Sequence, residues 1–247
     1  MKLCTFCNIN EATQTDSHIF TDFITTSLKR EGNISRVHKI TKDFPHKVIK
    51  PTQDTPKESN LFCPTCENGF SNKYERKISF TFYKNFLEKT NQFNVRFRKY
   101  NLSYNVYTNT DYILFKKFIF LQLYRIGVSN LAIKNNIALP SDQLNLLHKN
   151  LYDIEFFQDI KTLIFTTDFK WSKTSNLIFA GAVTNTSYIL WINEFIIIIQ
   201  FDHTEILFRE LEHAMNYENN SPRIIMASKK LWEHFTNTVA NTILTQK

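Results

Sequence analysis

All four cysteines of this 247-residue chain belong to two Cys-x-x-Cys pairs, Cys4/Cys7 and Cys63/Cys66. Each pair can place two thiolates on one tetrahedral ion, and two pairs complete a closed four-sulfur site whose metal contributes folding free energy. Such a site would tie the start of the chain to a segment far along it. The sequence therefore predicts one structural Zn²⁺ held by Cys4, Cys7, Cys63 and Cys66.

Three other uses of cysteine pairs compete with this prediction. A disulfide framework suits short secreted chains, and no signal peptide is expected here because Lys2 and Cys4 stand where an apolar stretch should begin. A thioredoxin-like redox motif needs only one pair, beside a βαβ pattern that the sequence lacks. One pair could also be two buried thiols. A shared zinc accounts for both pairs at once.

The composition indicates a folded chain with a large core. Hydrophobic residues make up 43 % of it, with 23 Phe, whereas only 4 Gly and 6 Pro argue against low complexity. The apolar run Phe195–Ile199 is far shorter than the ~20 residues that cross a bilayer. We expect a cytoplasmic protein without a membrane segment, a compartment in which cysteines stay reduced.

Positive charge is concentrated in the cysteine-bearing part of the chain. Residues 1–100 carry 17 Lys/Arg against 10 Asp/Glu, whereas residues 101–247 carry 13 of each, so the first part holds the whole formal charge of +7. A polar basic segment between the cysteine pairs could follow a phosphate backbone, although it could also be ordinary solvated surface. Its cations are Lys29, Arg30, Arg36, Lys39, Lys42, Lys47 and Lys50.

The N-terminal segments are expected to place these motifs on a knuckle, a hairpin and a helix. Asp16 or Ser17 is predicted to cap a helix that runs through residues 23–28. Residues 34–49 are predicted to form a hairpin, and residues 51–59 are predicted to form a loop. From Pro64 the apolar residues recur at helical spacing, which predicts a long helix. A cysteine pair at the start of a helix, closed against an earlier pair on a knuckle, is the treble-clef plan.

The rest of the chain predicts a mixed α/β region. Residues 111–128 read as an apolar helix and residues 141–148 as a second one capped by Ser141. Residues 161–169, 177–183, 188–192 and 195–201 read as strands, and residues 223–243 as a final helix. With neither a phosphate-binding glycine loop nor a nucleophile elbow, residues 101–247 are expected to act as a scaffold, a dimerisation surface or a partner-binding region.

The arrangement resembles the HNH branch of the His-Me finger endonucleases. The residues that carry the resemblance are the first cysteine pair, Ser17-His18-Ile19, Asn60, the second pair and Glu67, and the match extends over residues 4–75. Together with Gln53-Asp54, Phe70-Ser71 and Glu75, the pattern looks like a group of bacterial HNH-like proteins suspected of roles in phage defence. The resemblance implies a ββα unit held by cysteines, with a histidine base after the first pair.

By this resemblance, His18 would take a proton from water, which suits an imidazole whose unperturbed pKa is about 6.5. Glu67 would bind a catalytic Mg²⁺ or Mn²⁺, with Asp16 or Asn60 completing the site or Asn60 orienting the imidazole. Two positions depart from the family pattern: Ser17 stands where Asp or His is usual, and Glu67 where His is usual. Each site residue also has a structural interpretation: His18 as a histidine packed beside the knuckle, Glu67 as a carboxylate favoured at a helix N-terminus.

Glu75 lies eight residues after Glu67, about 12 Å further along a helix axis, so we expect the two not to share one ion. Glu75 is predicted to pair with Lys or Arg instead, or to hold the metal-binding side chains in position without binding the metal itself.

Taken together, the sequence predicts an α+β protein with a zinc-bound ββα domain at residues 1–95 and a mixed α/β domain at residues 101–247. The expected function is metal-dependent cleavage of DNA, or of RNA, with Lys39, Lys42, Lys47 and Lys50 binding phosphates. The main alternative is a non-catalytic zinc treble clef that binds nucleic acid or a partner protein. A purely structural zinc module is the third interpretation.

Overall fold

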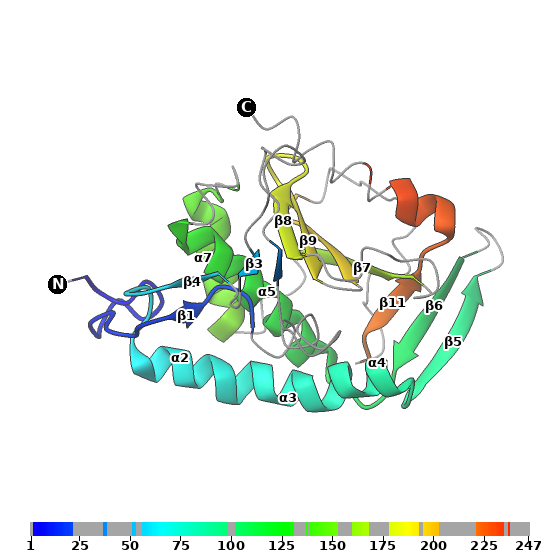
Figure 1. The fold of residues 1–247 in the computed structure, drawn as a ribbon, viewed down its shortest axis with the longest axis horizontal. Helices are drawn as coiled ribbons and strands as arrows, with labels where there is room; N and C mark the ends of the chain where they lie inside the picture. Colours follow the sequence, from blue (N-terminus) through cyan, green and yellow to red (C-terminus); the bar gives the residue numbers. More distant parts are fainter. Residues whose placement is uncertain are drawn as a thin grey trace.

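A continuous helical segment from Pro64 to Glu88 runs along the lower edge of the molecule (Figure 1). It belongs to a computed structural model that describes residues 2–21, 37–38, 51–52, 56–97, 102–130, 137, 139–152, 160–167, 178–192, 195–202, 221–234 and 237. The segment comprises α2 (Pro64–Phe70), η1 (Ser71–Glu75), α3 (Arg76–Ile78), η2 (Ser79–Tyr83) and α4 (Lys84–Glu88). The helix predicted from Pro64 is therefore confirmed.

Local chemistry explains where this helix begins and ends. Cys63 is its N-cap, with an extended backbone and a sulfur that accepts the N–H of Cys66, and Pro64 occupies the first helical position, where a missing N–H costs nothing. The segments η1 and η2 are π-helical turns, which are rare and often lie near functional sites. Lys89 ends the helix in the left-handed conformation, with φ 54°.

Seven strands form one sheet in the order β5-β6-β11-β7-β10-β9-β8. All neighbouring pairs are antiparallel except β11 and β7. The strands are β5 (Gln92–Phe97), β6 (Leu102–Tyr107), β7 (Lys161–Thr166), β8 (Ile178–Ala182), β9 (Ser187–Ile192), β10 (Phe195–Gln200) and β11 (Arg223–Met226). The four strands predicted between residues 161 and 201 are confirmed with slightly different ends.

Both faces of this sheet are buried at β9 and β10, where strand alternation sorts the side chains between the two faces. On β10, Phe195, Ile197 and Ile199 join one hydrophobic cluster, whereas Ile196 and Ile198 join a second one that contains Trp191 and Trp232. Because β9 and β10 are buried on both sides, they read as continuous apolar runs.

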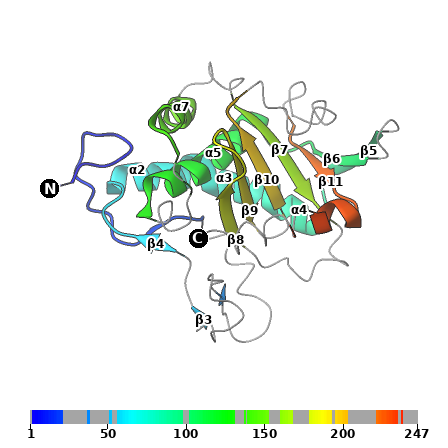
Figure 2. The same cartoon turned by 90° about the horizontal axis from the view of Figure 1, so that it is seen from above.

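The first hydrophobic cluster lies between the sheet and the helices (Figure 2). Helix α5 (Tyr112–Val128), capped by Asp111, and helix α7 (Ser141–Tyr152) pack against each other. Aromatic rings of η2 and α4 fill the space towards the sheet: Phe82 lies 4.4 Å from Phe115, and Phe86 lies 4.4 Å from Phe195, between ring centroids. Helices α5 and α7 match the predicted ones, although α7 continues past His148.

Three predicted elements differ from the structure. Residues 223–226 form β11 rather than the start of a helix, and among the described residues after it 229–234 and 237 are helical. Ser17 and His18 form strand β1, paired antiparallel with β4 (Lys57–Glu58), so Ser17 does not cap a helix. Residues 23–28, where the capped helix was predicted, lie outside the described residues. The predicted loop 51–59 contains β4 and also β3 (Pro51–Thr52), which pairs with β2 (Val37–His38).

The fold is thus mixed α+β, as the sequence predicted, with the cysteine-bearing region and the sheet contributing to one hydrophobic cluster that extends from Cys4 to Ile224. The boundary predicted between residues 95 and 101 falls within the β5–β6 pairing. Within the described residues, no helix combines the length and apolar character needed to cross a membrane.

Candidate metal centre and adjoining polar site

The four cysteines converge in space. Their Sγ atoms all lie within 4.8 Å of one another, and the Sγ atoms of Cys7 and Cys63 are 3.9 Å apart. Four sulfurs at about 2.3 Å from one tetrahedral Zn²⁺ are separated by roughly 3.8 Å, whereas a disulfide needs about 2.05 Å. All four cysteines are free thiols. The cluster therefore has the donor set and the spacing of a closed zinc site.

Backbone geometry on both sides shapes this cluster. The N-terminal knuckle closes through Cys4 N–H to the carbonyl of Asn10 at 2.8 Å and Asn8 N–H to the carbonyl of Cys4 at 2.9 Å, with Asn8 in the left-handed region at φ 54°. The sulfur of Cys63 accepts the N–H of Cys66 at 3.4 Å and the side-chain amide of Asn10 at 3.7 Å. Donors of this kind orient thiolate ligands around a metal.

The thiols differ in how readily they ionise. The pKa of Cys7 is lowered to about 6, chiefly by the backbone N–H of Asn10. Burial opposes ionisation of Cys63, but the N–H of Cys66 and the amide of Asn10 outweigh it and leave its pKa below the ordinary value. Burial raises the pKa of Cys4 and of Cys66. A cation bound by all four would ionise the remaining thiols.

Helices α5 and α7 hold the knuckle from the other side. Tyr124 donates its hydroxyl to the carbonyl of Thr5 at 2.7 Å, and Nε2 of His148 lies 2.7 Å from the carbonyl oxygen of Phe6. The Phe6 ring stacks on Tyr152 with centroids 4.9 Å apart. The four-cysteine cluster is therefore formed by residues between 4 and 66, but it packs against helices α5 and α7 of the second half of the chain.

Ser17 and Glu67 meet next to this centre. Ser17 is buried in β1, and Glu67 lies in the first turn of α2. Burial raises the pKa of Glu67 above its ordinary value; Arg125 opposes this shift, Glu75 adds to it, and the hydroxyl of Ser17 lowers it. Within the described residues, neither Ser17 Oγ nor Glu67 Oε2 completes a well-formed hydrogen bond. The Ser17 hydroxyl and the Glu67 carboxyl thus lie close together in a buried place.

Arg125 of α5 joins Glu67 to Glu75. Its guanidinium lies 3.0 Å from Glu67 Oε1 and 2.5 Å from Glu75 Oε1, and its side chain is 1 % exposed. Glu75 also accepts the hydroxyl of Thr21 at 2.9 Å, and Thr21 is held in turn by Gln122. The predicted pairing of Glu75 with a basic residue is confirmed. Although the two glutamates were expected not to share an ion, both side chains reach the same guanidinium.

The other predicted site residues have separate positions. His18 is half-buried, and in β1 it pairs with Lys57 of β4. Asp16 and Asn60 are exposed and adopt positive φ of 56° and 62° at the ends of these strands. In the part of the chain that the structure describes, no side-chain hydrogen bond joins Asp16 or Asn60 to Glu67. Lys39, Lys42, Lys47 and Lys50 lie outside the described residues.

Arg125 is the residue of this site that the sequence did not indicate. It was visible only as one of three cations in a strongly apolar helix, and a cation on such a helix must find a partner when it is buried. Comparison with known proteins adds nothing to this geometry, because the chain matches no protein-family model, no curated protein and no solved structure.

Proposed function

We propose that this chain is a metal-dependent, HNH-like endonuclease that hydrolyses DNA phosphodiester bonds. The observation that carries the proposal is the meeting of Ser17 with Glu67. The residue before the expected base and the residue after the last cysteine come from distant segments, yet they face each other beside the four-cysteine cluster. The order of β1, β4 and α2 along the chain is also that of a strand–strand–helix unit.

The donor set at this place suits a hard divalent cation. Glu67 Oε2 and Ser17 Oγ are buried oxygens that complete no well-formed hydrogen bond among the described residues, and Mg²⁺ or Mn²⁺ prefers oxygen ligands. Asp16 or Asn60 would have to move towards Glu67 to complete the set. When bound, the cation would neutralise charge on the phosphate and on the leaving oxygen.

Two residues of the chain would then have separate roles in cleavage. His18, on the strand that also holds Ser17, would take a proton from the attacking water, a role that contributes typically 10²–10⁴-fold to a rate. Arg125 would keep Glu67 in place from the far side, since it binds the other carboxylate oxygen. Phage defence is the biological setting that the family resemblance suggests.

The ion pair also favours a second candidate, a non-catalytic zinc module that binds nucleic acid or a protein. Arg125 already compensates the charge of Glu67, so this carboxylate holds a divalent cation less strongly than a free one would. In that case the polar site would serve only to join α2 to α5.

A cleavage assay separates the two candidates. The full chain should nick or cut plasmid, single-stranded DNA or RNA in the presence of Mg²⁺ or Mn²⁺. His18→Ala should slow cleavage by about 10²–10⁴-fold. Glu67→Gln should also slow it and raise the metal concentration required, because an amide binds a hard cation less well than a carboxylate.

Zinc content should stay the same in both variants, and His234→Ala, an exposed histidine on the C-terminal helical turn, is the matched control that should cut like the parent. If the parent cuts no substrate with any divalent metal, the binding module replaces the nuclease. If His18→Ala cuts as fast as the parent, the assignment of the base is wrong.

A further inference from the structure

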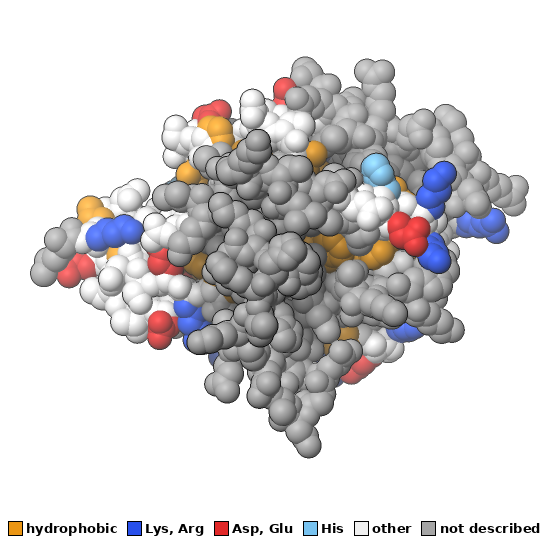
Figure 3. Space-filling model, turned by 45° about the horizontal axis from the view of Figure 1, so that its top comes forward, with side chains coloured by type: hydrophobic (Ala, Val, Ile, Leu, Met, Phe, Trp, Pro, Cys, Tyr) orange, Lys and Arg blue, Asp and Glu red, His pale blue; other side chains and the backbone are white. Residues whose placement is uncertain are grey.

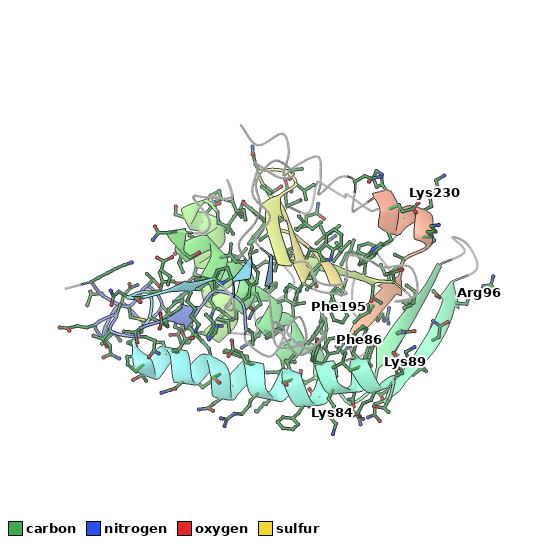
Figure 4. All side chains as sticks on the ribbon, in the orientation of Figure 1. Lys84, Phe86, Lys89, Arg96, Phe195 and Lys230 are labelled. Atoms are coloured by element: carbon green, nitrogen blue, oxygen red, sulfur yellow. The ribbon has the colours of Figure 1, made fainter. Side chains whose placement is uncertain are left out.

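The outer face of the helix from Pro64 to Glu88 carries a row of cations. Within residues 64–97 the acidic residues number three and the basic ones six. Five of the basic residues are exposed on or directly after this helix, and we refer to them as the cationic row: Lys73, Arg76, Lys77, Lys84 and Lys89. In Figure 4, Lys84 and Lys89 project from this part of the helix, and Arg96 extends from β5 beyond them.

Little negative charge opposes this row. Glu67 and Glu75 belong to the inner side of the helix, where Arg125 binds both of them. Glu88 reaches Lys84 at 3.9 Å, but both side chains are more than half exposed, so this pair is weak. Lys73, Arg76, Lys77 and Lys89 make no ion pair within the described residues. Among the described residues, the row is thus a strip of positive charge opposed only by the weak pair of Lys84 with Glu88.

The strip has the length of a nucleic-acid site. Lys73 and Lys89 are sixteen residues apart, which at ~1.5 Å per residue corresponds to roughly 24 Å along the axis. Single-stranded sites on other protein surfaces span about 4–16 nucleotides, and at ~3.4 Å per stacked nucleotide a strip of this length matches about seven. By contrast, Figure 3 shows a different face, on which the basic side chains of the described residues stand apart, several of them beside acidic ones.

Large apolar side chains lie exposed among the cations of this row instead of being buried. Phe80 is 68 % exposed and Leu87 52 % exposed, both on the helix, and Phe93 on the following strand is 51 % exposed. Exposed aromatic rings among cations offer faces on which unpaired bases stack, while the cations follow the phosphates. A hydrophobic docking face for a protein would not need an uncompensated cationic row.

We propose that the cationic row, together with Phe80, binds a single strand of nucleic acid along the outer face of this helix. The proposal rests on the proposed function for its substrate class, since the same helix carries Glu67 in its first turn. Binding is nevertheless separable from cutting, because none of these side chains belongs to the catalytic set.

The test measures binding of a fluorescent 20-nucleotide single strand to full-length His18→Ala protein between 50 and 200 mM KCl, by anisotropy. Adding Lys73→Gln, Lys77→Gln and Lys84→Gln should weaken binding at least tenfold at low salt and reduce the log–log salt slope by about 2, at ~0.7 per lost contact. Phe80→Ala should weaken binding by roughly 5- to 150-fold with little change in slope.

The matched control neutralises three exposed lysines elsewhere, Lys2, Lys149 and Lys230, and should bind like its parent. The proposal is overturned if the row variant and the control variant lose the same amount of binding affinity, or if Phe80→Ala binds as tightly as its parent. It is also overturned if the protein binds duplex more tightly than single strand. If substitutions in the cationic row weaken binding of the single strand but the parent protein cuts no nucleic acid, the proposed nuclease function is wrong and the proposed binding surface is still supported.

Discussion

At the scale of single residues, Arg125 decides how the polar site is held together. One guanidinium that is 1 % exposed binds two carboxylates, and it also lies 5.3 Å from the centre of the Phe70 ring. Its Nε has no hydrogen-bond partner among the described residues. Two negative charges therefore depend on one positive charge in a buried place, which makes the site sensitive to loss of that cation.

We predict that Arg125→Met destabilises the protein by about 3–5 kcal/mol, because Glu67 and Glu75 are then left buried without a counter-charge. Adding Glu67→Gln and Glu75→Gln should recover most of this loss, since neutral amides have a much smaller desolvation cost. Urea unfolding of the two variants measures both effects. If the triple variant is no more stable than Arg125→Met alone, lost packing rather than charge explains the defect.

The sequence predicted some of these residues and missed others for a physical reason. The cysteines were recognisable because two pairs at this spacing have few other uses. The basic partner of Glu75 was expected from charge alone, but its identity depended on how α5 packs against the helix, which no local pattern specifies. The helix spacing of Glu67 and Glu75 argued against a shared metal ion, but it could not show that two nitrogens of one guanidinium would reach both carboxylates.

At the scale of elements, the approach of α7 to α5 depends on a glycine. A Cβ added at Gly127 would lie 2.6 Å from Leu139 Cδ1 and 2.8 Å from Leu144 Cδ2, closer than side chains tolerate. A Cβ at Gly69, in α2, would meet nothing within 4 Å. The two helical glycines thus form a natural comparison.

Gly69→Ala should stabilise the protein by about 0.5–1 kcal/mol, because alanine loses less backbone entropy in a helix. Gly127→Ala gains the same helix propensity, but its methyl group overpacks the contact between α5 and the segment 139–152. This overpacking costs about 1–3 kcal/mol, so the net effect on stability should be destabilising. Chemical denaturation of both variants checks the signs. Equal stabilisation by the two alanines would show that Leu139 and Leu144 move aside freely.

Element prediction succeeded where patterns were long and failed where they were short. The helix from Pro64 and helix α5 have clear starts, at Cys63 and Asp111, and many apolar repeats. Ile224 and Ile225 fit a helix or a strand equally well, and only their position between β6 and β7 makes β11 a strand. The β5–β6 pair was missed, although Phe93, Val95 and Phe97 alternate with polar residues.

At the scale of the whole molecule, the four-cysteine centre connects three parts that are far apart in sequence. The knuckle at the N-terminus rests on α5 and α7 through Tyr124 and His148, and the second cysteine pair opens the helix that leads to the sheet. The same helix holds Glu67 against Ser17, and its outer face carries the cationic row. Both proposals therefore place their sites on a helix that the four cysteines join to the knuckle.

Zinc coordination in the full-length protein tests this dependence most directly. Elemental analysis combined with X-ray absorption spectroscopy should give one zinc per chain, surrounded by four sulfur ligands at about 2.3 Å, because Cys4, Cys7, Cys63 and Cys66 already converge. Protein that folds without zinc, or a zinc with fewer than four sulfur ligands, would contradict the account.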